Sequence, residues 1–156
     1  MTPAIKLAQK QNVAHTVHSY EHDSNSLSYG DEARQKLAVD ANRVFKTLIV
    51  ELSTGALAVG VVPVNGKLNL KAMANALGAK KAHMADTDKA QRSTGYLLGG
   101  ISPIAQKKAL KTVIHCSAQD LGTVFVSAGR RGVEIELHAA CLAKLCKAQF
   151  AQIASI

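Results

Sequence analysis

The run Val44–Leu52 is the feature of this 156-residue chain that most restricts its fold. In a strand its apolar side chains would alternate, with Val44, Leu48 and Val50 on one face and Phe45, Thr47 and Ile49 on the other. Apolar side chains on both faces are typical of a strand that is covered on both sides. The sequence therefore predicts that the chain is arranged around a strand at residues 44–52.

Lys46 interrupts one apolar face of this predicted strand. A charged side chain among apolar neighbours is costly unless it is paired or faces a wet cavity. We therefore predict that Lys46 is a functional residue. The alternative is a lysine whose aliphatic stem is buried while its ammonium reaches water at the edge of the sheet.

Periodicity and turn signals predict short strands and helices along the whole chain, without an internal repeat or a linker. The predicted strands are residues 13–20, 44–52, 56–62, 80–84, 112–116, 123–127 and 133–137, and the predicted helices are residues 3–11, 30–37, 69–77, 86–91 and 139–149. In the last strand we expect Glu134 and Glu136 on the face opposite the apolar side chains. This pattern favours one mixed α/β domain over residues 1–156, with a strongly curved mixed sheet and short helices around it.

The segment 92–103 fits neither a helix nor a strand, because it contains Gly95, Gly99 and Gly100 and closes with Pro103. Such a loop can leave several N–H groups pointing at open space, where they would bind a carboxylate, a phosphate or a developing oxyanion. The segment also offers the hydroxyls of Thr94, Tyr96 and Ser102. The simpler interpretation is a glycine-rich turn between two core elements. A second glycine turn is predicted at residues 127–132.

The chain is strongly basic, with a net charge of +8 and a sequence pI of about 9.6. A folded domain of this charge favours an anionic partner, with nucleic acid first, although the charge would also suit a merely soluble basic surface. The basic residues expected near the two glycine turns, flanking one cleft, are Arg92, Lys107, Lys108, Lys111, Arg130 and Arg131.

Other classes of protein find little support in the sequence. No apolar run approaches the length of a membrane span and the first residues lack the apolar core of a signal peptide, so we expect a cytoplasmic protein. The odd number of cysteines argues against a disulfide framework, and their spacing does not suit zinc. His18 and His22 flank Tyr20 without a third ligand at a known spacing. We therefore predict no metal and no cofactor.

Several motifs in one order and spacing resemble the YbaK family of aminoacyl-tRNA deacylases. They are Met1–Ala4, Tyr20–Asp23, Phe45–Leu48, the run Ser93–Pro103 and the turn Ser127–Gly132, and together they extend over essentially the whole chain. The resemblance implies a mixed α/β fold with a curved, partly barrel-like sheet. It also implies a stand-alone editing domain that clears tRNA(Pro) mischarged with cysteine, acting beside prolyl-tRNA synthetase.

The same resemblance implies a set of site residues. The family's functional positions fall on Tyr20, Lys46, Gly99, Ser127 and Glu134, where relatives often carry Asp at the last position and Gly at the position of Ala128. We predict Lys46, Gly99 and Gly100 as catalytic residues. We predict that the substrate contacts Tyr20, Thr47, Thr94, Ser127, Gly129 and Glu134, and that tRNA contacts Arg92, Lys107, Lys108, Arg130 and Arg131.

The residues suggest no protein nucleophile, because no Ser-His-Asp order or nucleophile elbow is present. The residues themselves suggest that the N–H groups around Gly99 and Gly100 bind the substrate carbonyl as an oxyanion hole. The resemblance implies that the substrate's own thiol attacks this carbonyl. The alternatives are a deacylase for another small amino acid, such as alanine, and a non-catalytic RNA-binding module. We expect aminoacylated tRNA and, transiently, prolyl-tRNA synthetase as partners, and a monomer or weak oligomer.

Overall fold

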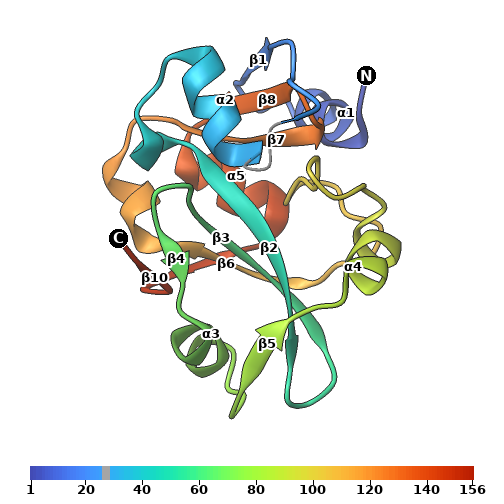
Figure 1. Cartoon of the computed structure of the whole chain (residues 1–156), viewed down its shortest axis with the longest axis vertical. Coiled ribbons are helices and arrows are strands. Elements are labelled where there is room, and N and C mark those ends of the chain that lie inside the picture. The colour runs from blue at the N-terminus through green and yellow to red at the C-terminus, as the bar shows by residue number, and fades with distance from the viewer. Residues whose placement is uncertain (26–28) are drawn as a thin grey trace.

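The computed structural model describes residues 1–25 and 29–156 (Figure 1). Its helices are α1 (Pro3–Lys10), α2 (Tyr29–Leu37), α3 (Leu70–Ala76), α4 (Thr87–Thr94) and α5 (Ala139–Cys146), with 3-10 turns η1 (Ala41–Arg43) and η2 (Cys116–Asp120). Its strands are β1 (Thr16–Ser19), β2 (Phe45–Leu52), β3 (Leu57–Pro63), β4 (Lys67–Leu68), β5 (Ala82–Met84), β6 (Lys111–His115), β7 (Val124–Arg130), β8 (Val133–Leu137), β9 (Gln149–Ala151) and β10 (Ala154–Ser155). This is the mixed α/β fold that the sequence predicts.

A five-stranded sheet in the order β5-β2-β3-β6-β9 forms the larger part of the structure. β2 and β3 form an antiparallel hairpin, β6 pairs in parallel with β3, and β9 pairs in parallel with β6. β5 pairs only with the second half of β2, at residues 50–52. Residues 45–48 of β2 therefore have no strand partner on that side in the described chain, and this open edge is where the candidate site lies.

A second, three-stranded sheet has the order β1-β8-β7 and lies above the first in Figure 1. The two sheets meet where Val44 pairs with Phe125. Apolar side chains of both sheets fill the space between them, together with Ala4 and Ala8 of α1 and Leu142 of α5. The opposite face of the five-stranded sheet is covered by α3, through the fully buried Met73. The strand at residues 44–52 is thus covered on both faces, as predicted.

Several predicted boundaries differ from the structure. The last helix ends at Cys146, because Lys147 adopts a left-handed conformation, and residues 149–151 form β9 rather than more helix. α4 runs to Thr94, past the predicted end at residue 91. β7 continues to Arg130 through a bulge, so the tight turn before β8 is shorter than the predicted one at residues 127–132. No helix in the described residues is long and apolar enough to cross a membrane.

Candidate active site

A small cavity opens at the unpaired edge of β2, and we call it the Lys46 pocket. Its volume is about 220 Å³. The residues that sequence analysis predicted and that line it are Tyr20, Lys46, Thr47, Gly99, Ser127 and Glu134. The lining residues that it missed are Tyr29, Gly30, Asp31, Phe45, Leu48, Val64, Leu98 and Ile101. Segments far apart in the sequence therefore meet here. They are the end of β1, the start of α2, β2, the β7–β8 pair and residues 95–103 after α4, which we call the glycine loop.

Lys46 is the single lysine or arginine among the described residues that line the pocket. The side chain is half-buried, and it has no ion-pair or hydrogen-bond partner among the residues that the structure describes. Removal from water, reinforced by the nearby charge of Lys67, lowers the pKa of Lys46. An unpaired, partly desolvated cation at a cavity wall attracts the negative charge of a ligand or of a transition state.

Glu134 lies on β8, beside Ser127 of β7 and His18 of β1 in the sheet register. The residue is 6% exposed, and burial raises the pKa of its carboxyl to about 8. The predicted alternation is correct, but the face that carries Glu134 is covered rather than solvated, with Tyr20 close by. At neutral pH the carboxyl is therefore largely protonated and can donate a hydrogen bond into the pocket.

Three hydroxyls complete the polar lining. Thr47 Oγ1 is buried and has no hydrogen-bond partner within the described residues, so a ligand in the pocket would satisfy it. Burial, with the nearby charge of Glu134, raises the pKa of Tyr20 to about 12, which keeps the phenol neutral. Ser127 Oγ accepts a hydrogen bond from the N–H of Gly129 at 3.1 Å and retains its own proton as a donor.

Gly99 of the glycine loop offers a backbone N–H to the pocket. Residues 97–100 form a turn in which the N–H of Gly100 donates to the carbonyl of Leu97, while Gly99 has a φ of +90°. The N–H of Gly99 has no backbone partner among the described residues. An added Cβ at Gly99 would lie 3.3 Å from the Tyr29 ring, so glycine is needed for both its conformation and its contact.

Gly100 has a different role from the predicted one. Its N–H is used within the turn, and an added Cβ would lie 2.8 Å from the backbone nitrogen of Arg131. Gly100 therefore lets the glycine loop pack against the β7–β8 turn and does not offer a second oxyanion donor.

Thr94 and Gly129 are likewise outside the Lys46 pocket. Thr94 is 1% exposed, and its hydroxyl donates to the carbonyl of Ala90 and accepts from the N–H of Tyr96. An added Cβ at Gly129 would lie 2.6 Å from the Tyr96 ring. The hydroxyl of Tyr96 itself donates to the carbonyl of Ile104 at 2.6 Å, so these hydroxyls hold the loop together instead of facing a ligand.

The predicted tRNA contacts differ in their surroundings. Exposed positions are held by Arg92, Lys107, Lys108 and Arg130. Arg131 is different, because its guanidinium bonds the Asp23 carbonyl at 2.6 Å and Glu32 at 3.4 Å and lies 4.6 Å from the centre of the Tyr29 ring. Arg131 therefore ties the β7–β8 turn to α2 and to Asp23, and its predicted contact with tRNA stays a prediction.

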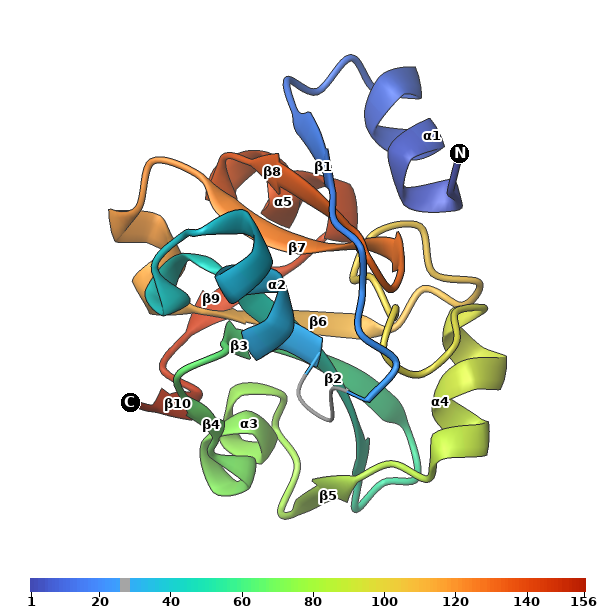
Figure 2. The ribbon, with the colours of Figure 1, turned by 45° about the horizontal axis from the view of Figure 1, so that its top comes forward.

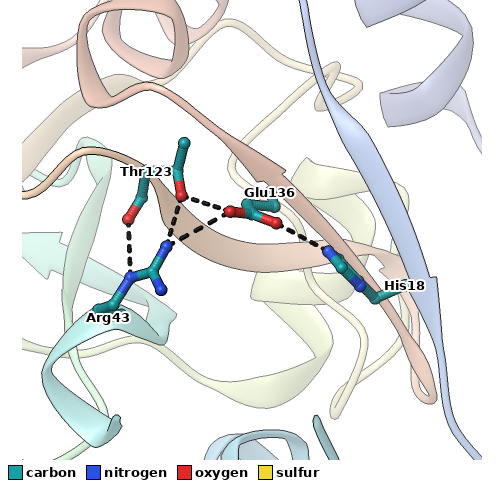
Figure 3. Close-up of polar contacts among 4 residues, drawn as sticks. All are labelled: His18, Arg43, Thr123 and Glu136. Carbon is teal, nitrogen blue, oxygen red and sulfur yellow. Dashed lines mark hydrogen bonds and ion pairs between the residues drawn. The ribbon is translucent and has the colours of Figure 1, made fainter. Parts of the chain in front are cut away.

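His18 belongs to a polar network with Glu136, Thr123 and Arg43 (Figure 3). Its Nε2 lies 2.9 Å from Glu136 Oε1, and the other oxygen of Glu136 accepts from Thr123 and Arg43. The Thr123 hydrogen bond, then His18, lower the pKa of Glu136. The network ties β1, β8 and η1 together. No group of three His, Cys, Asp or Glu side chains in the described ranges could hold a metal ion.

The fold and this pocket together define a mixed α/β domain in which a small cavity lies beside a lysine without a partner in the described residues and a buried carboxyl. A family model for the “Aminoacyl-tRNA editing domain” matches residues 25–145. The chain is 34% identical over 152 residues, 97% of its length and 92% of the relative, to an Enterococcus faecalis (strain ATCC 700802 / V583) protein provisionally named Cys-tRNA(Pro)/Cys-tRNA(Cys) deacylase EbsC. The chain belongs to the aminoacyl-tRNA editing domain family.

Two solved structures support the same fold. One, provisionally described as a trans-editing enzyme for prolyl tRNA synthetase, has a TM-score of 0.83 and 17% identity, over 100% of this chain and 99% of that chain. The other, the hypothetical protein APE2540, has a TM-score of 0.88 and 21% identity, over 99% and 100% of the two chains.

Proposed function

We propose that this protein is a trans-acting aminoacyl-tRNA deacylase that removes cysteine from mischarged tRNA(Pro). The observation that carries the proposal is the unpaired, half-buried Lys46 ammonium in a pocket of about 220 Å³. The similarity to EbsC supports the assignment of cysteine and of tRNA(Pro). Alanine remains a second small amino acid to test, because a pocket of this volume does not separate the two side chains by size.

The proposed chemistry uses the substrate's own thiol. The thiol sulfur attacks the ester carbonyl, the new sulfur–carbon bond forms, the ester carbon–oxygen bond breaks, and the thiol proton passes to the departing 3′ oxygen of the tRNA. The products are free tRNA and a four-membered cyclic thioester of cysteine, which water then opens to give free cysteine. An activated ester needs little further catalysis beyond positioning. The pocket suits such a reaction because its described lining contains no cysteine and no histidine that would serve as a protein nucleophile or base.

Each pocket group has a place in this scheme. The Lys46 ammonium and the Gly99 N–H would stabilise the oxyanion that develops on the carbonyl. The protonated Glu134 carboxyl and the Thr47 hydroxyl would bind the amino-acid part of the substrate, and Tyr20 and Ser127 would border it. These roles follow from which side chains lack partners and face the pocket.

The proposed substrate also defines the partners. Free aminoacyl-tRNA would be bound in the cytoplasm, and prolyl-tRNA synthetase, which releases the mischarged tRNA, would be a transient partner. The test is a deacylation assay with Cys-, Ala- and Ser-tRNA(Pro). We expect cysteine to be released fastest. Release of alanine alone would move the assignment to the other small amino acid, and release of none would contradict a deacylase.

A further inference from the structure

A second cavity of about 640 Å³ lies beside the Lys46 pocket, and we call it the Leu97 groove. The two cavities share a wall, formed by Tyr20 and Leu98. The groove is much larger than an amino-acid side chain needs, and no step of the proposed deacylation uses it. Its position next to the pocket means that a ligand bound in one cavity could extend directly into the other.

The segments that line the Leu97 groove contact one another closely at three glycines. Figure 2 shows the loop that follows α4 beside the end of β7. Added Cβ atoms would lie 2.8 Å from the Arg131 nitrogen at Gly100, 2.6 Å from the Tyr96 ring at Gly129 and 2.9 Å from the Tyr20 carbonyl at Gly132. These contacts fix the glycine loop, the β7–β8 turn and the end of β1 relative to one another. The groove is therefore preformed, which lowers the entropic cost of binding a ligand.

The groove is lined by exposed apolar side chains and by positively charged side chains. Leu97 is 74% exposed and Leu98 is 57% exposed, and both side chains line it. Arg130 lines the groove and is exposed, and the Lys107 Cβ lies beside Gly95, another lining residue. No aspartate or glutamate is present among the described lining residues. An anionic ligand with flat apolar faces fits this combination, which is the chemistry of single-stranded nucleic acid.

We propose that the Leu97 groove binds the single-stranded 3′-terminal nucleotides of the aminoacyl-tRNA. This inference rests on the proposed function. The aminoacyl ester crosses the wall between Tyr20 and Leu98 into the Lys46 pocket, and the preceding bases lie against Leu97 and Leu98. Arg130 and Lys107 contact their phosphates. The enzyme then recognises its substrate in two adjoining parts, a small pocket for the amino acid and a larger groove for the nucleotides.

The test compares cysteinyl-adenosine, cysteinyl-CCA trinucleotide and full Cys-tRNA(Pro) as substrates. The wild-type KM should fall clearly from the first substrate to the second. Leu97→Ser should raise the trinucleotide KM roughly five- to tenfold, because an apolar contact is lost. Arg130→Ser should reduce the slope of log affinity against log salt by about 0.7, as for one phosphate contact on a single strand. Matched controls are Met84→Ser, exposed on the far edge strand β5, and Lys144→Ser, exposed on α5.

A binding experiment separates this inference from the proposed function. Fluorescence anisotropy of an uncharged, labelled CCA oligonucleotide needs no hydrolysis. If the wild type binds it, and Leu97→Ser and Arg130→Ser weaken binding while the controls do not, the groove assignment holds even if Cys-tRNA(Pro) is not hydrolysed. The assignment is overturned if the wild type does not bind the oligonucleotide, or if Leu97→Ser and Met84→Ser behave alike while deacylation proceeds.

Discussion

The Lys46 ammonium lies at the open edge of β2 and has no partner in the described chain. Because the ammonium is partly removed from water without a counter-charge, it lowers the stability of the fold. Lys46→Ala should lower the deacylation rate roughly 100-fold or more, as removal of an oxyanion contact does. The free energy of unfolding should change by less than about 1 kcal/mol, because no folded-state pair is lost.

Single-turnover kinetics and urea denaturation measure these two effects of Lys46→Ala. Lys80→Ala is the matched control, since Lys80 is exposed and does not line the pocket. Turnover at the wild-type rate in Lys46→Ala would remove Lys46 from the mechanism. A large loss of stability would instead indicate a structural lysine.

Glu134 gives the protein a defined pH dependence. Its pKa is raised from 4.5 to about 8 in the folded state, so the folded protein binds more protons than the unfolded chain between these values. The contribution of Glu134 to stability is therefore fully present below about pH 4.5 and is lost as the pH rises through about 8. In Glu134→Gln the side chain cannot ionise, so the contribution of residue 134 to the unfolding free energy should not change with pH between 4.5 and 8.

The measurement is the difference in unfolding free energy between Glu134→Gln and wild type at pH 5, 7 and 9. This difference should move in favour of the variant as the pH rises, by at most a few kcal/mol, since one pKa unit corresponds to about 1.4 kcal/mol. Other titrating groups cancel in the comparison. A difference that does not vary with pH would show that Glu134 ionises normally.

The chemistry of individual residues was only partly predictable from the sequence. The pattern around Lys46 indicated a functional lysine, and the family resemblance selected Tyr20, Gly99, Ser127 and Glu134, which the structure brings to one pocket. The internal contacts of Thr94 and Arg131 were not predicted, because sequence does not show which way a side chain turns. The Thr94 hydroxyl donates to the carbonyl of Ala90 within α4, and the Arg131 guanidinium forms an ion pair with Glu32.

At the scale of elements, the packing of the glycine loop on the β7–β8 turn positions the pocket. Gly100→Ala would place a Cβ 2.8 Å from the backbone of Arg131, which cannot move without disturbing β7 and β8. We expect a loss of about 1–3 kcal/mol in unfolding free energy, as for other overpacked sites. Urea denaturation measures it, with Gly122→Ala as control because an added Cβ there meets no atom within 4 Å. Equal stability of the two variants would contradict this role for Gly100.

Long, apolar elements were predicted well from sequence, and three very short strands were not. β2, β3 and β8 have clear periodicity, and three predicted helices begin at a capping side chain that accepts a backbone hydrogen bond, at Thr2, Asn69 and Asp86. β4, β9 and β10 have only two or three residues each. β9 forms because β6 offers it a parallel edge, and that long-range pairing leaves no local signal.

At the scale of the whole molecule, the described lining of the Lys46 pocket contains no protein thiol. None of the three cysteines lines the Lys46 pocket. Burial raises the pKa of Cys146 to about 12, and the thiol of Cys116 donates to Gln152 Oε1. The only thiol that the proposed reaction needs is therefore the one on the substrate.

The most direct test is single-turnover deacylation of matched Cys- and Ser-tRNA(Pro) by wild-type protein and by a variant with Cys116, Cys141 and Cys146 replaced together by alanine, with analysis of the released product. We predict that the cysteine-free protein releases cysteine from Cys-tRNA(Pro) at nearly the wild-type rate. Both proteins should act poorly on Ser-tRNA(Pro), because a hydroxyl ionises far less than a thiol at neutral pH. Comparable rates on the two substrates, or loss of activity in the cysteine-free protein despite a normal fold, would contradict attack by the substrate's own thiol.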